Sequence, residues 1–140
     1  MSYRYLEEGP TADLMVEARG RTLGEAFAQA ALSFFNAFTP LEKIEAKEEF
    51  EVQAEGRDLE SLLFNLMDEL LYINDVENLV AKEVDVEVDM ERLVAVARCR
   101  GERFQPGRHE PGIMVKAVTY HLMEIKETPE GWVVRVVFDT

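Results

Sequence analysis

The chain has 140 residues, of which 47% are hydrophobic and 31% are charged, and this composition is typical of a globular domain rather than a disordered segment. We therefore predict a single domain over residues 1–140. The formal net charge of −13 excludes the basic surface on which most nucleic-acid binders depend, so we expect no strong direct binding of RNA or DNA. A basic protein or a hard cation is a better match for so many carboxylates, although charge alone can also serve solubility.

No apolar run approaches the roughly 20 residues that a membrane-spanning helix needs, so we expect no membrane association. The first eight residues lack the basic and apolar segments of a secretory signal. Cys99 is the only cysteine and cannot form an internal disulfide. These features favour a cytoplasmic protein.

Two long helices are predicted from apolar side chains that recur at helical spacing. The first begins at Thr22, where Thr22 and Glu25 have the capping-box spacing, and ends before Pro40. The second begins at Asp58 and has a leucine-rich face between residues 59 and 71. Both apolar faces are interpreted as core.

Most of the remaining chain has the alternating pattern of strands, at residues 14–19, 49–54, 84–90, 93–100 and 119–126. Residues 132–138 are apolar on both faces apart from Arg135, which is typical of a central strand. We predict the α+β class: a mostly antiparallel sheet with two long helices packed on it. Residues 101–112 have two prolines and three glycines and are expected to form an exposed loop.

Two carboxylates lie at the ends of predicted strands. Asp13 opens the first clear strand and Asp139 closes the last, one residue before the carboxylate of Thr140. If these strands are antiparallel neighbours, the oxygens converge and suit a hard cation such as calcium or magnesium. A turn-capping Asp13 and a solvated Asp139 are the alternative, and spacing alone does not exclude it.

Lys116 lies in an apolar stretch, residues 112–120, where it is either a site lysine facing carboxylates or a lysine that snorkels from a half-buried strand. His109 and His121 are not spaced with other ligands and do not indicate zinc. No phosphate-binding glycine loop, nucleophile elbow or cysteine–histidine pair is present, so the sequence does not indicate a self-sufficient enzyme.

The sequence resembles the archease family nearly from end to end. The matching stretches, in the family's order and spacing, are residues 5–6, 11–13, 20–27, 59–64, 69–72 and 115–120, with the apolar strand that ends at Asp139.

The resemblance implies an accessory protein with no catalytic residues of its own, which activates the RtcB-type RNA ligase of tRNA splicing. Such partners promote guanylylation and multiple turnover of the ligase. The family binds a divalent cation, reported as calcium, and its ligand positions correspond here to Asp13, Asp139 and Thr140. A lysine that the family needs for activation corresponds to Lys116.

Two positions depart from the family pattern. The histidine of its His-Thr-Ala-Asp motif is missing, because Gly9 and Pro10 stand before Thr11. Thr140 stands where the family usually has a terminal isoleucine or valine. If this residue binds the cation through backbone or terminal oxygens, the change should be tolerated; if its apolar side chain packs, some stability is lost. Two other functions are compatible with the sequence: a chaperone or general protein-interaction module, and a small metal-dependent hydrolase, although no water-activating base is identifiable for the hydrolase.

Overall fold

The computed structural model describes residues 1–6 and 13–140. In chain order the elements are β1 (Ser2–Leu6), β2 (Asp13–Gly20), α1 (Leu23–Phe38), the 3₁₀ turn η1 (Leu41–Lys43), β3 (Glu48–Glu55), α2 (Leu59–Glu77), β4 (Leu79–Asp89), β5 (Val94–Arg103), β6 (Ala117–Thr128) and β7 (Gly131–Asp139).

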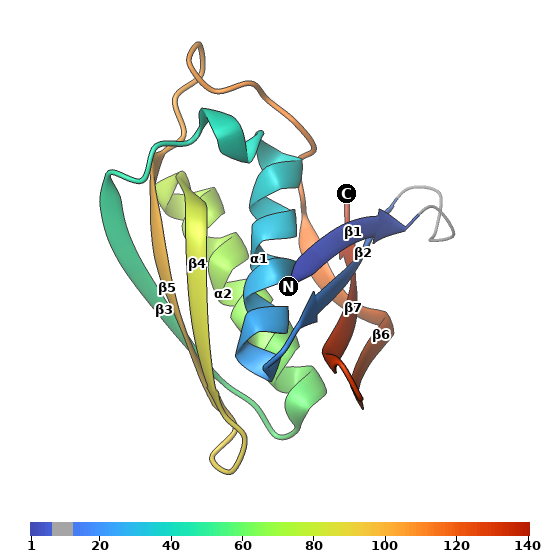
Figure 1. The fold of residues 1–140 in the computed structure, drawn as a ribbon. Coiled ribbons are helices and arrows are strands. Elements are labelled where there is room, and N and C mark those ends of the chain that lie inside the picture. The colour runs from blue at the N-terminus through green and yellow to red at the C-terminus, as the bar shows by residue number, and fades with distance from the viewer. Residues whose placement is uncertain (7–12) are drawn as a thin grey trace.

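The strands form two antiparallel sheets, with the helices between them (Figure 1). One sheet has the order β1-β2-β7-β6 and the other has the order β3-β5-β4. Helix α1 packs on β2 and β7 of the first sheet and on β4 of the second, while α2 contacts β3 and β6. The predicted α+β class with two long helices is confirmed, and the division of the strands between two sheets is the feature that the sequence pattern did not reveal.

Both helices begin at the predicted caps. The Thr22 hydroxyl accepts the Glu25 N–H at 3.1 Å, and the Glu25 carboxylate accepts the N–H of Arg21 at 2.7 Å. At α2 the Asp58 carboxylate accepts the Ser61 N–H at 2.7 Å, and the Ser61 hydroxyl accepts the Asp58 N–H in return. These bonds satisfy amide donors that the first turn of a helix leaves unpaired.

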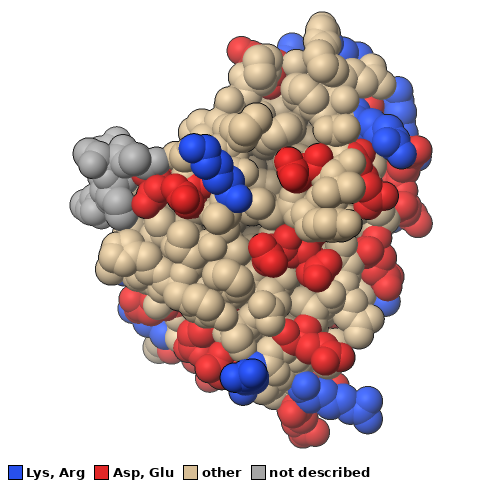
Figure 2. Space-filling view, turned by 180° about the vertical axis from the view of Figure 1, so that it is seen from behind, with Lys and Arg blue, Asp and Glu red and all other residues tan. Residues whose placement is uncertain are grey.

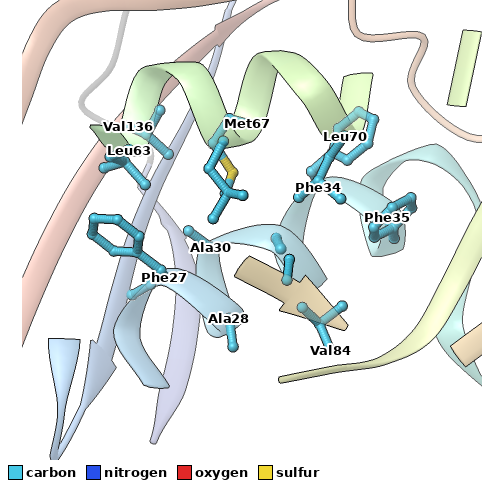
Figure 3. Packing of buried hydrophobic residues seen from close by; sticks show 14 of the residues in the cluster. Phe27, Ala28, Ala30, Phe34, Phe35, Leu63, Met67, Leu70, Val84 and Val136 are labelled. Atoms are coloured by element: carbon cyan, nitrogen blue, oxygen red, sulfur yellow. The ribbon is translucent and has the colours of Figure 1, made fainter. Parts of the chain in front are cut away.

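The core lies where the two helices meet both sheets. Figure 3 shows Phe27 and Phe34 of α1 among Leu63, Met67 and Leu70 of α2, all of them almost completely buried. The apolar faces of the two helices are therefore core, as predicted.

β7 is central, as its two apolar faces predict, because β2 and β6 pair with it on either side. The predicted β6–β7 hairpin is also present and turns at Pro129 and Glu130. The short strand β1 has no clear pattern in the sequence. Its Tyr5 hydroxyl donates to the Ser33 carbonyl at 2.9 Å and ties the strand to α1.

The segment after β5 differs from the exposed loop predicted for residues 101–112. β5 continues to Arg103, and the side chains of Glu102 and His109 are buried, with 3% and 2% of their surface exposed. The physical reason is a set of hydrogen bonds that satisfies both side chains, described below. The prediction of an exposed loop was therefore wrong for residues 101–103, which belong to β5, and for the buried His109, while residues 105–108 are exposed.

Candidate functional site

The sheet register places Asp13 directly opposite Asp139. β2 and β7 are antiparallel neighbours, and their terminal pair is Asp13 with Asp139. On an antiparallel pair, directly opposed side chains project from the same face with Cβ atoms about 4.5–5.5 Å apart. Both carboxylates therefore stand together at one end of the sheet, because the two strands are the antiparallel neighbours that the convergence required.

The face they share is the outer one, turned away from the helices. Val136 and Phe138 of β7 belong to the main core, so the alternating residues Val137 and Asp139 face the other way. Within residues 1–6 and 13–140, neither Asp13 nor Asp139 has a side-chain hydrogen bond or ion pair. Like charges placed directly opposite destabilise each other, so a cation between them would remove an unfavourable interaction.

Lys116 joins this end of the sheet through its backbone. Its N–H donates to the Asp139 carbonyl at 2.7 Å, just before β6 begins. The side chain is exposed and its ammonium has no ion pair in the described part of the chain. Both interpretations offered by the sequence, a site lysine and a lysine that snorkels from the strand, therefore stay predictions.

Thr140 follows Asp139 and is half-buried. Thr11 and Ala12 of the predicted motif lie outside the described residues. Among the residues that are described, no three side chains of His, Cys, Asp or Glu gather closely enough to hold a metal ion. A cation at this end of the sheet would need oxygens of Thr140 or of the backbone beside the two carboxylates, and a hard cation accepts such oxygens.

The two histidines lie outside this group of residues. His109 is buried against Glu102 and Phe104, and His121 is exposed on β6. Burial raises the pKa of the Cys99 thiol to about 12, so the only cysteine is not a thiolate at neutral pH.

A polar cluster that the sequence did not reveal surrounds Glu102. Its carboxylate accepts the Glu45 N–H at 2.6 Å and lies 2.9 Å from His109 Nε2, and Arg108 pairs with its other oxygen. The Gln105 N–H donates to His109 Nδ1 at 2.8 Å, so Nε2 is the protonated nitrogen that donates to Glu102. Every member of the cluster has a partner, which indicates a structural role.

The rear face of the molecule, seen in Figure 2, has more acidic than basic side chains, in keeping with the net charge of −13. The described residues include no helix that is long and apolar enough to cross a membrane.

Comparison with known proteins gives consistent matches over almost the whole chain. Residues 3–140 match the model of the Archease protein family (MTH1598/TM1083). Protein archease of Pyrococcus furiosus is 41% identical over 132 residues, covering 92% of this chain and 93% of that protein. The archease-like protein of Drosophila melanogaster is 39% identical over 133 residues, covering 94% and 84%.

A solved structure also matches this chain over almost its full length. The solution structure of protein 1598 of Methanobacterium thermoautotrophicum has a TM-score of 0.81 with 34% identity and covers 99% of each chain. Sequence, fold and the order of the motifs coincide over nearly the full length, and this chain therefore belongs to the archease family.

Proposed function

We propose that this archease activates an RtcB-type RNA ligase in tRNA splicing, by promoting guanylylation and repeated turnover of the ligase, and has no catalytic activity of its own. The observation that carries the proposal is the pairing of Asp13 with Asp139 at one end of the β1-β2-β7-β6 sheet, where the Lys116 backbone N–H donates to the Asp139 carbonyl. The family membership supports the same role. A protein that works beside a cytoplasmic RNA enzyme without competing for RNA benefits from a charge of −13.

We further propose that a divalent cation, calcium by preference, binds between Asp13 and Asp139 with oxygens of Thr140. Two opposed carboxylates without partners in the described residues favour a cation on charge grounds. All-oxygen ligation suits calcium or magnesium rather than zinc or copper.

Lys116 has a different role in this proposal, because an ammonium cannot be a cation ligand. Its backbone N–H donates to the Asp139 carbonyl, while its side chain is exposed to solvent. We assign the ammonium to contact with the ligase or its guanylate.

Calcium titration by calorimetry and a ligase guanylylation assay test the proposal together on three variants. Asp13→Ala and Asp139→Ala remove a ligand and a negative charge, so we expect calcium affinity to fall at least tenfold and activation with it. Lys116→Ala should lower activation at least tenfold with calcium affinity within about twofold of the parent, since no ligand is removed.

Asp75→Ala and Lys43→Ala are matched controls, because both side chains are exposed and far from the strand ends in sequence. Neither should change calcium binding or activation. If both aspartate variants bind calcium like the parent, the cation site is rejected. If adding the parent protein leaves ligase guanylylation and turnover unchanged, the activator function is rejected. General protection of unrelated proteins from aggregation would instead support the chaperone alternative.

A further inference from the structure

The outer face of the β1-β2-β7-β6 sheet has a second polar cluster, farther along the strands. Arg135 of β7 lies between the core residues Val134 and Val136, so its side chain faces outward. Its directly opposed neighbours are Glu17 on β2 and Glu124 on β6. This cluster is separate from the Glu102 cluster and has no part in the proposed cation site.

Glu17 is buried, with 8% of its surface exposed, and is already neutralised by two arginines. Its Oε1 atom accepts Arg4 Nε at 3.1 Å and Arg19 Nη2 at 3.1 Å. Burial acts to raise the pKa of Glu17, but the bonds and charges of the two arginines outweigh it and leave the pKa below its usual value. Glu17 is therefore a fixed carboxylate that has no need of Arg135.

Glu124 is likewise shared by two cations. Arg135 Nη1 lies 3.5 Å from its Oε2 atom, and Lys126 Nζ lies 3.4 Å from its Oε1 atom. Across the cluster, two carboxylates are thus surrounded by four cationic side chains. On a chain with 28 acidic and 15 basic residues, this local excess of positive charge is unusual.

One donor in the cluster is unsatisfied. Arg135 Nε is buried and has no hydrogen-bond partner, and it is the only side-chain nitrogen or oxygen of this kind among the described residues. A buried donor without a partner destabilises a folded protein, so native proteins nearly always supply one. With Nη1 directed to Glu124, the Nε edge of the guanidinium is the side available for another acceptor.

A cavity of about 40 Å³ adjoins this arginine. It is lined by Glu17, Arg19, Glu124, Lys126, Val133 and Arg135. The Nε edge of an arginine donates in parallel to two oxygens of one carboxylate or phosphate. Side chains of Arg19 and Lys126 are half-exposed, so they can adjust to an incoming group.

We propose that this cluster binds one oxyanion, with phosphate as its chemical class, through the Arg135 Nε edge and the charges of Arg19 and Lys126. The site is independent of the proposed cation. Asp139 and Arg135 are four residues apart on one strand, a separation of about 13 Å, so the anion would not be a ligand of the cation.

NMR detection of the arginine Nε–H groups tests the site directly. Inorganic phosphate is titrated into the full chain at constant ionic strength, with chloride as the balancing anion and acetate in a parallel arm. We expect a saturable shift of the Arg135 Nε–H signal with phosphate. Arg135→Lys keeps the charge but removes the Nε donor, so phosphate affinity should fall at least tenfold.

Arg98→Lys is the matched control, because Arg98 lies on the other sheet and its Nε atom already has Glu51 at 3.4 Å. It should bind phosphate like the parent. If Arg135→Lys does not fold, Lys126→Gln on the exposed edge strand should still weaken binding about threefold. A parent protein without a saturable Arg135 shift, or an equal loss in the Arg98 control, would overturn the site, and tighter binding of acetate would overturn its assignment to phosphate. These outcomes need no ligase and leave the activator proposal to its own test.

Discussion

Glu102 holds in place the segment that connects β5 to β6. Its carboxylate, near the end of β5, accepts a hydrogen bond from His109 and pairs with the neighbouring Arg108. Beyond His109 the chain continues along α1, where the Gly112 N–H donates to the Phe38 carbonyl at 2.8 Å. The path toward Lys116 is therefore anchored at both of these points.

Replacing Glu102 with glutamine tests the cluster. Glu102→Gln keeps the shape but removes the charge and places an amide among donors, so we expect the free energy of unfolding to fall by about 2–4 kcal/mol. Urea unfolding followed by circular dichroism measures this. Glu110→Gln, an exposed neighbour in the same segment, should change stability by less than about 0.5 kcal/mol.

The same carboxylate predicts acid sensitivity. Burial acts to raise the pKa of Glu102, but the Glu45 N–H, the His109 ring and a guanidinium outweigh it and hold the pKa below its usual value. A lowered folded-state pKa gives stability that is complete above the unfolded value, about 4.5, and is lost as pH falls through the folded value. The melting temperature should therefore fall as the pH is lowered from about 4.5, and it should fall less steeply in Glu102→Gln. Equal pH dependence of the two melting temperatures would contradict this.

The approach of α1 to β4 depends on a glycine in the first turn of the helix. A Cβ added at Gly24 would clash with the Val86 carbonyl oxygen of β4. Alanine favours a helix by about 1 kcal/mol over glycine, but the clash is with backbone and cannot be relieved by a rotamer change. We expect Gly24→Ala to lose about 1–3 kcal/mol in urea unfolding, whereas Gln29→Ala on the same helix should be neutral or slightly stabilising.

The elements that the sequence predicted well are those with long patterns or local chemistry. The capped helices and the β4–β5 and β6–β7 hairpins follow from periodicity and turn residues. β1 is five residues long, and its position depends on pairing with β2 and on contacts with α1. The separation into two sheets likewise depends on which strands each helix covers, and no single segment contains that information.

The candidate site was partly predictable for the same reason. The sequence pattern places Asp13 and Asp139 at strand ends. It does not show that the two strands are neighbours, which only the fold reveals. Glu102 and Arg135 gain their significance from burial and from partners that are distant or on other strands, which a pattern of residues does not show. The roles of Asp13, Lys116, Asp139 and Thr140 remain predictions.

Across the face shown in Figure 2, acidic side chains outnumber basic ones. A phosphate backbone is repelled by a net charge of −13, so we expect no measurable shift of tRNA in a gel assay at about 150 mM salt. A tight complex that weakens steeply with added salt would contradict the expectation. Adding the ligase to the same gel provides the positive control.

The central place of β7 also determines when the molecule can finish folding. The β3-β5-β4 sheet and α2 are built from neighbouring segments. β2 pairs early with β1, but its other edge pairs with β7, which comes about 110 positions later. At a synthesis rate of about 5–20 residues per second, that delay is roughly 6–22 s. During that time one edge of β2 lacks its neighbouring strand, and Asp13 meets Asp139 only when β7 pairs with it. The proposed cation site would thus be assembled only on chains whose synthesis has reached the end of β7, so that, if the proposal holds, cation binding would mark chains in which β7 has paired with β2.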